Sequence, residues 1–203
     1  MPPTPRSSFS AATTITLSLQ AAVNCTSWRQ RGELDLFFLS GMQIDRHGNF
    51  NLHVIGDYTS PSVRMAGAYG SAMLYYMAHR VILFRPDHTV RTFVERVDFV
   101  TAPGATPEHV YREGGPTLVV TSKAVLGWDD PAQGWVLQRV HPGSSVDDVR
   151  QNTGFDLRVS PSVRITPPPS TEELYTLRTV VREKLFRLYP DFVRQKIRRA
   201  SPP

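Results

Sequence analysis

The fold is decided by the stretch Glu33-Leu-Asp-Leu-Phe-Phe-Leu-Ser-Gly-Met-Gln-Ile-Asp45. Its first part is a short apolar run that stops at Ser40-Gly41, which is typical of a buried strand followed by a tight turn. The residues that follow, up to Asn51, alternate in polarity and contain His47-Gly-Asn49, which predicts a second strand and a turn that glycine and asparagine allow. A folded domain is therefore expected from Glu33 onward.

Strands and helices are predicted to alternate after this start. A run of helix-forming residues at 72–80 opens just after a glycine loop, and Ser145 caps a short helix. Apolar runs predict further strands at 81–84, 117–121 and 135–140. This order of elements predicts an α/β domain built on an open, mostly parallel sheet with flanking helices.

Two connections have their own signatures. Asp129-Asp-Pro-Ala-Gln-Gly134 separates two strand-like runs and predicts a hairpin loop. Ser170-Thr-Glu-Glu173 follows three prolines and has the pattern of a capping box, which predicts a terminal helix. Apolar residues of that helix fall three and four apart and form one stripe: Leu174, Leu177, Val181, Leu185 and Leu188. The chain is thus divided into a poorly structured segment 1–30, an α/β domain 31–170, and an amphipathic basic helix with its tail at 171–203.

Composition narrows the class of protein. The 203 residues are 40% hydrophobic and 20% charged, enough for one core of ordinary size. The single cysteine, Cys25, excludes an intrachain disulfide framework, and a reducing cytoplasm is expected. No apolar run is long enough to cross a bilayer, so no membrane association is expected.

The net charge of +5 belongs mainly to the end of the chain. From Thr171 onward there are eight basic and four acidic residues, so this part carries +4 and residues 1–170 carry only +1. Arginines on the terminal helix could contact phosphate, but a solvated basic face of an amphipathic helix is the commoner case. Nucleic acid is therefore not an expected partner.

Familiar catalytic and phosphate-binding motifs are missing from the sequence. It contains no G-x-G-x-x-G, no G-x-x-x-x-G-K-[ST] and no G-x-S-x-G, which disfavours dinucleotide-binding, NTPase and serine hydrolase classes. Asp45, His47, His53 and Asp57 could in principle meet around a metal ion. Loop side chains that hydrogen-bond their own turns are the simpler interpretation, so no metal site is predicted. The segment Gly67-Ala-Tyr-Gly-Ser71, called the glycine segment below, precedes a predicted helix and would let a ligand approach the backbone closely.

Several runs occur together in an order that is more specific than any of them alone. They are Gly41–Asn51, Ile55–Tyr58, Arg64–Ser71, Phe93–Gly104, Gly115–Thr121 and Asn152–Asp156. The series resembles the β subunit of family I coenzyme A transferases, of the glutaconate CoA-transferase and 3-oxoacid CoA-transferase kind, over roughly Glu33 to Leu188. The resemblance implies a CoA-transferase type α/β fold that is incomplete at its amino terminus.

The resemblance also implies an activity. It is that of a two-subunit cytoplasmic enzyme that moves coenzyme A from an acyl-CoA to a carboxylic acid, with acyl-CoA as substrate, no permanently bound cofactor and an α subunit as partner. In that family a glutamate of the β subunit attacks the thioester and forms a covalent glutamyl-CoA intermediate. The glutamate belongs to a short E-[SN]-G motif upstream of the Gly41 run, and this chain has no glutamate before Glu33 and no such motif. No residue of this chain is therefore assigned as catalytic, and the sequence is expected to lack the amino-terminal part of the usual subunit.

The resemblance places Gly67, Gly70 and Ser71 near the acyl-CoA. It places Gln43, Asp45, Asn49 and Asn51 in the neighbouring turn, where hydrogen bonding within the turn is the alternative role. The glycine segment departs from the family's G-x-G-G-A, because Tyr69 stands where a glycine is expected. Tyrosine adopts positive φ only at a cost, so close approach of an acyl-CoA at this point is in question.

Two further functions stay open at this stage. Some relatives on this scaffold cleave carbon–carbon bonds in cyclic acyl-CoA compounds, and they also lack the standard glutamate of the β subunit. A non-catalytic binding or scaffold subunit is the third hypothesis.

Overall fold

A computed structural model describes residues 34–112, 114–130 and 133–198 of the chain. Its contacts divide the chain into two compact units, one that ends at Arg164 and one that begins at Ile165. The predicted poorly structured segment 1–30 lies outside the described residues.

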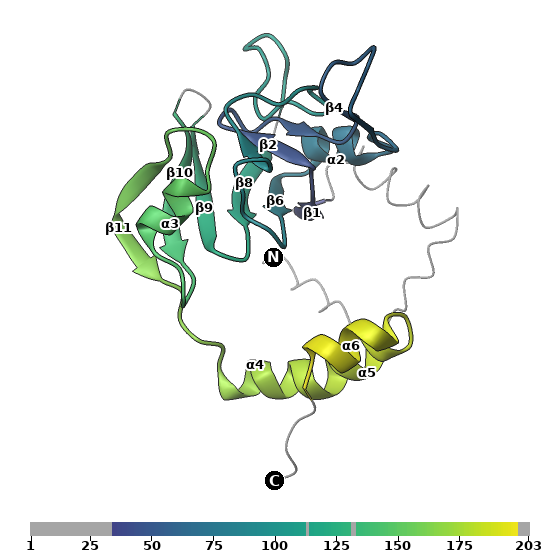
Figure 1. Ribbon diagram of the computed structural model, residues 1–203, viewed down its shortest axis with the longest axis vertical. Helices are drawn as coiled ribbons and strands as arrows, with labels where there is room; N and C mark the ends of the chain where they lie inside the picture. Colours follow the sequence, from purple (N-terminus) through teal and green to yellow (C-terminus); the bar gives the residue numbers. More distant parts are fainter. Residues whose placement is uncertain (1–33, 113, 131–132, 199–203) are drawn as a thin grey trace, which may run out of the picture. The chain divides into compact units, whose positions relative to one another are not determined.

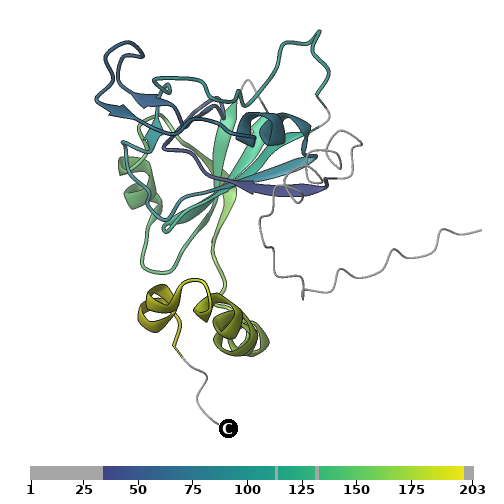
Figure 2. The same cartoon turned by 90° about the vertical axis from the view of Figure 1, so that its right-hand side faces the viewer.

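The first unit is organised by a six-stranded sheet in the order β1-β6-β8-β9-β10-β11 (Figure 1). Its strands are β1 (Leu36–Leu39), β6 (Arg80–Phe84), β8 (Gly115–Val120), β9 (Ala124–Asp130), β10 (Gly134–Val140) and β11 (Arg158–Ile165). β1, β6 and β8 run parallel, and β9 and β10 continue the sheet as an antiparallel hairpin. The twist of this sheet is visible in Figure 2. The predicted α/β class is confirmed, and the parallel part is the half that starts at β1.

The apolar runs of the parallel strands point alternately to the two faces of the sheet. Leu39, Val81, Leu83 and Val119 lie on the face that forms the core and are almost completely buried. On β1, Phe38 lies on the opposite face and is 57% exposed. Within the run predicted as a strand, β1 is present at Leu36–Leu39 and has one buried and one open face.

The predicted hairpin is confirmed. Its two strands pair from Asp130 opposite Gly134 to Ala124 opposite Val140, with Gly134 at φ +69°. Trp135 on β10 is 2% exposed, and its indole Nε1–H donates to the backbone carbonyl of Asp45 at 3.0 Å. The hairpin thereby holds the turn that follows β2 (Gln43–Asp45).

Two small sheets carry the segments around the candidate site. β2 pairs antiparallel with β3 (Phe50–Asn51) and parallel with β7 (Phe93–Val94). β4 (Val54–Ile55) and β5 (Val63–Arg64) form a separate antiparallel pair. Figure 1 shows β2, β4 and helix α2 (Ser71–Met77) in the same part of the unit.

Two short helices complete the first unit. On α2, Tyr75 is fully buried, packs edge-on against Phe50 with ring centroids 4.8 Å apart, and donates its hydroxyl to the carbonyl of Gly48 at 2.6 Å. Helix α3 (Val146–Gln151) begins at the predicted cap, since the Ser145 side chain accepts the N–H of Asp148. Figure 1 shows α3 beside the β9 to β11 part of the sheet.

The second unit is helical. Ser170 and Glu173 form the predicted capping box at the start of α4 (Thr171–Thr176). The helix continues through a π-helical turn, η1 (Leu177–Val181), into α5 (Arg182–Phe186), and then the chain turns into α6 (Pro190–Lys196). α6 packs against α5 and buries Val193, whereas Leu188 at the turn is 67% exposed. The predicted apolar stripe is thus only partly covered within this unit.

Candidate functional site

The turn after β2 is built around the carboxylate of Asp45, which is fully buried. Its Oδ1 accepts the backbone N–H groups of His47 at 2.9 Å and Asn49 at 3.0 Å. Its Oδ2 accepts the side-chain amide of Asn49 at 3.0 Å and the backbone N–H of Val97 at 3.3 Å. Four donors therefore compensate one buried charge, and this geometry fixes the turn from 45 to 49.

A second polar cluster joins β2, β3 and the segment after β7. Asn51 donates its amide to Gln43 Oε1 at 2.8 Å, and Gln43 donates its own amide to Asp98 Oδ2 at 3.0 Å. Asn51 Oδ1 accepts the N–H of His53 at 2.9 Å. We call Gln43, Asp45, Asn49, Asn51 and Asp98 together the polar turn.

The structure thus places the four polar residues predicted from the sequence in two neighbouring clusters and adds Asp98 to the second. Their oxygen and amide groups bond to one another and to neighbouring backbone. Hydrogen bonding within the turn, the alternative role considered from the sequence, is therefore present. A contact with coenzyme A stays a prediction for these residues.

The glycine segment lies beside this network. Gly67 has φ +91°, donates its N–H to the carbonyl of Leu52 at 3.1 Å, and faces His53. A Cβ placed at residue 67 would lie 3.4 Å from Nε2 of His53, whereas one placed at Gly70 would meet nothing within 4 Å. Ser71 opens α2 and bonds back to the carbonyl of Ala68 through its N–H and its hydroxyl. The three predicted residues therefore belong to one backbone stretch, which is in contact with His53 at Gly67 and has open space beside it at Gly70.

Tyr69 is the irregular residue of the segment. It has φ +47°, the one positive φ at a non-glycine residue among those the structure describes, and it is 91% exposed. A cost for tyrosine at this position is expected from the sequence, and the left-handed conformation carries that cost because its Cβ crowds the backbone. The ring points into solvent and leaves the space beside Gly70 open.

His53 was considered from the sequence only as a metal ligand, whereas the structure places it against the glycine segment. Its Nδ1 is 2.7 Å from the hydroxyl of Thr101, and its ring packs on Phe99 with centroids 4.5 Å apart. Phe99 stacks in turn on Tyr58 at 5.3 Å, and the guanidinium of Arg64 lies 5.2 Å from the centre of the Tyr58 ring. The one sequence signal for a position of His53 near the site is that it follows Asn51 by two residues.

Metal binding finds no support in this geometry. The carboxylate oxygens of Asp45 already accept hydrogen bonds within their own turn. Asp57 accepts the backbone N–H and the hydroxyl of Thr59, and these hydrogen bonds lower the pKa of Asp57. Within the described ranges there is no group of three or more His, Cys, Asp or Glu side chains that could hold a metal ion. The same ranges contain no helix that is both long and apolar enough to span a membrane.

Two basic side chains, partly buried Arg112 and buried His88, stabilise the fold around the site. The guanidinium of Arg112 donates to the carbonyls of Pro103, Gly104 and Tyr75, and burial lowers the pKa of Arg112. His88 is 2% exposed, lies between the hydroxyls of Thr121 at 2.9 Å and Thr153 at 3.0 Å, and burial lowers its pKa to about 4. Both groups join segments that are distant in the sequence.

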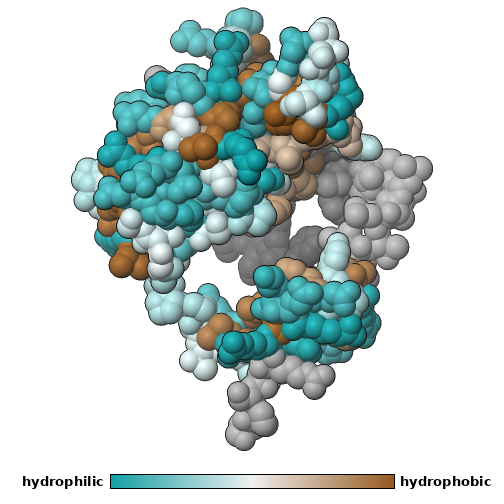
Figure 3. Space-filling model, viewed as in Figure 1, coloured by the Kyte–Doolittle hydropathy of each residue, from teal (hydrophilic) through white to brown (hydrophobic). Residues whose placement is uncertain are grey.

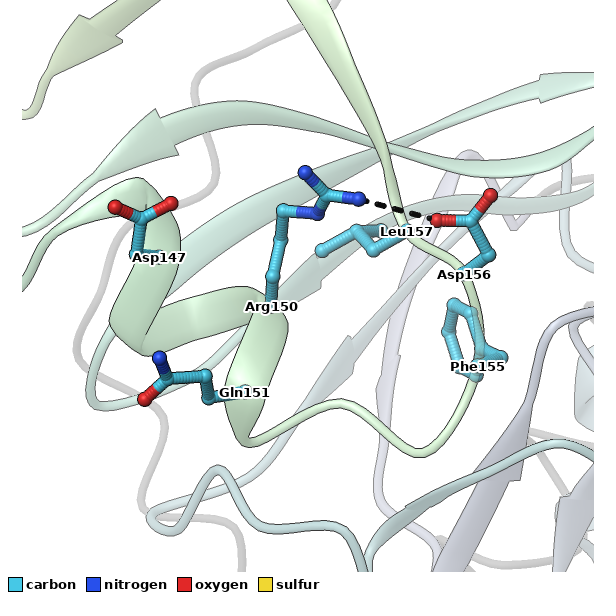
Figure 4. Close-up of a pocket in the computed structure, with 6 residues that line it drawn as sticks. All are labelled: Asp147, Arg150, Gln151, Phe155, Asp156 and Leu157. Atoms are coloured by element: carbon cyan, nitrogen blue, oxygen red, sulfur yellow. Dashed lines mark hydrogen bonds and ion pairs between the residues drawn. The ribbon is translucent and has the colours of Figure 1, made fainter.

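A surface pocket of about 350 Å³ lies elsewhere, along α3 (Figure 4). Its lining residues are Asp147, Arg150, Gln151, Phe155, Asp156 and Leu157. Arg150 and Asp156 form an ion pair across it at 3.3 Å, and the Asp156 side chain is 90% exposed. Such an open ion pair contributes little to binding or stability, so the glycine segment is the stronger candidate.

Comparison with known proteins gives a family match over most of the chain. A family model described as coenzyme A transferase matches residues 8–152, a range that contains the polar turn and the glycine segment and ends before the helical unit. The family match begins at residue 8, whereas the resemblance drawn from the sequence begins only at Glu33.

Three relatives illustrate the range of the family. The chain is 33% identical over 160 residues to the β subunit of 3-oxoadipate CoA-transferase from Pseudomonas knackmussii, covering 75% of this chain and 61% of that protein. It is 38% identical over 138 residues to the β subunit of glutaconate CoA-transferase from Acidaminococcus fermentans, covering 64% and 51%. It is 33% identical over 143 residues to the cholesterol ring-cleaving hydrolase IpdB subunit of Rhodococcus jostii, covering 68% and 56%.

The fold agrees with these sequence matches. The crystal structure of glutaconate coenzyme A-transferase from Acidaminococcus fermentans superposes with a TM-score of 0.67 at 29% identity, over 79% of this chain and 63% of that chain. The chain thus spans between half and two thirds of the length of the relatives it matches. Because the family model covers well over half of the sequence and the fold matches as well, this chain belongs to the coenzyme A transferase family.

Proposed function

We propose that this chain is the β-type subunit of a complex that transfers coenzyme A between an acyl-CoA and a carboxylic acid. The observation that carries the proposal is the glycine segment, whose open backbone at Gly70 adjoins a rigid polar turn within the range matched by the family. The transferase relatives, named for 3-oxoadipate and glutaconate, support this reaction class.

The acyl-CoA is proposed to lie along Gly67, Gly70 and Ser71. A substituent-free backbone lets a thioester approach closely, and the absence of a neighbour within 4 Å of Gly70 leaves room for it. Gln43, Asp45, Asn49 and Asn51 then act by holding the turn against which this segment rests. Coenzyme A enters as part of the substrate, and no permanently bound cofactor is proposed.

The attacking carboxylate is proposed to come from outside this sequence. A carboxylate is a modest nucleophile, so it needs a desolvated position and hydrogen-bond donors for the oxyanion that forms on the thioester carbonyl. The sequence has no match to the E-[SN]-G motif, and the segment at Gly67 to Ser71 offers backbone rather than a nucleophile. In the proposed cycle the enzyme carboxylate attacks the thioester carbonyl and expels CoA thiolate, which leaves a mixed anhydride. The thiolate then attacks the enzyme carbonyl of this anhydride, so that the first acid leaves and a glutamyl-CoA thioester remains on the enzyme. The acceptor acid passes through the same two steps in reverse, which forms the new acyl-CoA and frees the enzyme carboxylate.

A second chain is proposed as the partner, of the α-subunit type. The relatives are named as single subunits of larger enzymes, and β1 carries exposed apolar side chains at Leu36 and Phe38, with Phe84 beside them on β6. Apolar patches on the face shown in Figure 3 are of the kind that a partner covers. A cytoplasmic location is proposed with this assignment.

The test is a CoA-exchange assay on the chain co-expressed with a candidate α-type subunit. Acetyl-CoA and an isotopically labelled dicarboxylic acid should give a labelled acyl-CoA, and hydroxylamine should trap a glutamyl thioester on the complex. The proposal is supported if the wild-type complex exchanges CoA and the Gly67→Val complex does not. A stable complex without exchange or trapped thioester contradicts it and favours a binding or scaffold role.

A second candidate function is cleavage of a ring in a cyclic acyl-CoA by hydrolysis. The observation that favours this function is the similarity to the ring-cleaving hydrolase subunit, which is 33% identical to this chain, as is the 3-oxoadipate relative. The same complex offered a cyclic dione thioester separates the two functions. Ring opening without any transfer of CoA to an added acid would select the hydrolase.

A further inference from the structure

We propose that His53 selects the acyl group, by donating a hydrogen bond from its Nε2–H to an oxygen atom that the acyl chain carries beyond the thioester. The inference rests on the proposed function, because it concerns the ligand of the glycine segment. It assigns acyl groups with an oxo or carboxylate oxygen as the preferred class over plain alkyl chains.

The position of the imidazole is the first support. Its Nε2 is the nearest atom to the point where a side chain at Gly67 would begin, at 3.4 Å. A ligand that uses the space left by the missing side chain therefore meets this nitrogen first. Among residues 34–112, 114–130 and 133–198, no hydrogen-bond partner is found for Nε2.

The second support is the tautomer, which we assign from hydrogen-bond geometry. The hydroxyl oxygen of Thr101 accepts the backbone N–H of Leu52 at 2.7 Å and lies 2.7 Å from His53 Nδ1. A hydroxyl has one hydrogen, and Nδ1 is where it finds an acceptor. Nδ1 then has no hydrogen in the neutral ring, so Nε2 carries it and faces the glycine segment as a donor.

The third support is that the ring is held in place. The Asn51 side chain fixes the backbone N–H of His53, and Phe99, itself stacked on Tyr58, packs against the ring. A donor fixed before binding loses little conformational entropy when it meets its acceptor. A plain alkyl group at the same place would leave Nε2–H without a partner once water is displaced, which disfavours that ligand.

The experiment measures binding rather than turnover. The purified two-chain complex is titrated by calorimetry with acetoacetyl-CoA, succinyl-CoA and butyryl-CoA, which have the same number of acyl carbons. Wild type should bind at least one oxygen-bearing thioester about tenfold more tightly than butyryl-CoA, the size of effect that one well-placed hydrogen bond gives.

Three variants isolate the donor. His53→Phe keeps a ring on Phe99 but has no donor, so it should lose the preference through weaker binding of the oxygen-bearing thioester and tighter binding of butyryl-CoA, whose alkyl chain no longer strands a donor. His53→Gln restores an N–H near the position of Nε2 and should recover part of the preference. His109→Phe, at an exposed histidine of the loop before β8, is the matched control and should change nothing.

A spectroscopic readout separates orientation from mere packing. Nitrogen-15 chemical shifts of the His53 ring should show the Nε2–H tautomer in wild type and a mixture in Thr101→Val. A wild-type complex that binds none of the thioesters overturns the proposed function and this assignment with it. Binding with a preference that survives His53→Phe overturns only the role of His53.

Discussion

The polar turn and the glycine segment are neighbours, but they differ in how completely their polar groups are hydrogen-bonded. In the polar turn the carboxylate of Asp45 meets four donors, and the amides of Gln43 and Asn51 bond to each other. In the glycine segment Tyr69 holds a costly backbone conformation, and one nitrogen of the adjoining His53 has no partner in the described part of the chain. The difference favours a stabilising role for the first region and supports the proposal that the second region binds the ligand.

Asp45→Ala should break the polar turn and have the largest effect. It removes the acceptor of the partly buried N–H groups of His47 and Asn49 and of the buried N–H of Val97, so the free energy of unfolding should fall by about 3 kcal/mol. Urea unfolding followed by circular dichroism measures this loss. Asp156→Ala is the matched control because that side chain is 90% exposed, and a change there as large as at residue 45 would refute the interpretation.

Two histidines show the same contrast. Among the described residues, both ring nitrogens of His88 have a hydrogen-bond partner, whereas only Nδ1 of His53 has one. Folding lowers the pKa of His88 from about 6.5 to about 4, so its contribution is fully present above pH 6.5 and is lost as the pH falls towards 4. A shift of this size corresponds to about 3 kcal/mol of unfolding free energy. Urea unfolding at pH 7 and pH 4.5 should show a steeper loss for wild type than for His88→Gln, and parallel losses would contradict the assignment.

Two glycines sharpen the comparison within the glycine segment. Gly67→Ala should cost about 1 to 2 kcal/mol of unfolding free energy and weaken thioester binding, because φ +91° strains any residue with a Cβ. Gly70→Ala is the matched control for stability alone, with an ordinary φ of −97° and open space around the added methyl group. Thermal unfolding of the two variants should differ by several degrees, and equal melting temperatures would count against the strain argument.

Tyr69→Asn should give the smallest effect and one of opposite sign. Asparagine tolerates the left-handed conformation better than tyrosine, so the unfolding free energy should rise by about 0.5 kcal/mol. Tyr111→Asn serves as control, because Tyr111 is also exposed and has no positive φ. Thermal unfolding measures both, and a destabilised residue 69 variant would show that the exposed ring itself stabilises the segment.

Local signals in the sequence predicted the local structure well. The strand that ends at Leu39, the hairpin between β9 and β10, and the caps at Ser145 and Ser170 all depend on residues within a few positions of one another. The polar residues of the predicted site also lie close together, because they belong to two paired strands, β2 and β3, and the turn between them.

What the sequence could not predict depends on contacts between distant segments. The hydroxyl that orients His53 is 48 residues away in the chain, and Asp98 reaches Gln43 across 55 residues. Periodicity carries no information on such pairs. The interruption of the terminal helix at the turn before α6 was missed for another reason, since its apolar stripe continues in register up to Leu188.

The indole of Trp135 ties the hairpin to Asp45, and the ring of Trp128 occupies the space where Gly48 would carry a side chain, at 2.8 Å from that point. These two aromatic groups touch each other at 4.7 Å between ring centroids. Their emission therefore reports on the immediate surroundings of the turn without any added label. A substitution of either tryptophan, beside the loop of this hairpin and far along the chain, would therefore change the surroundings of residues 45–48.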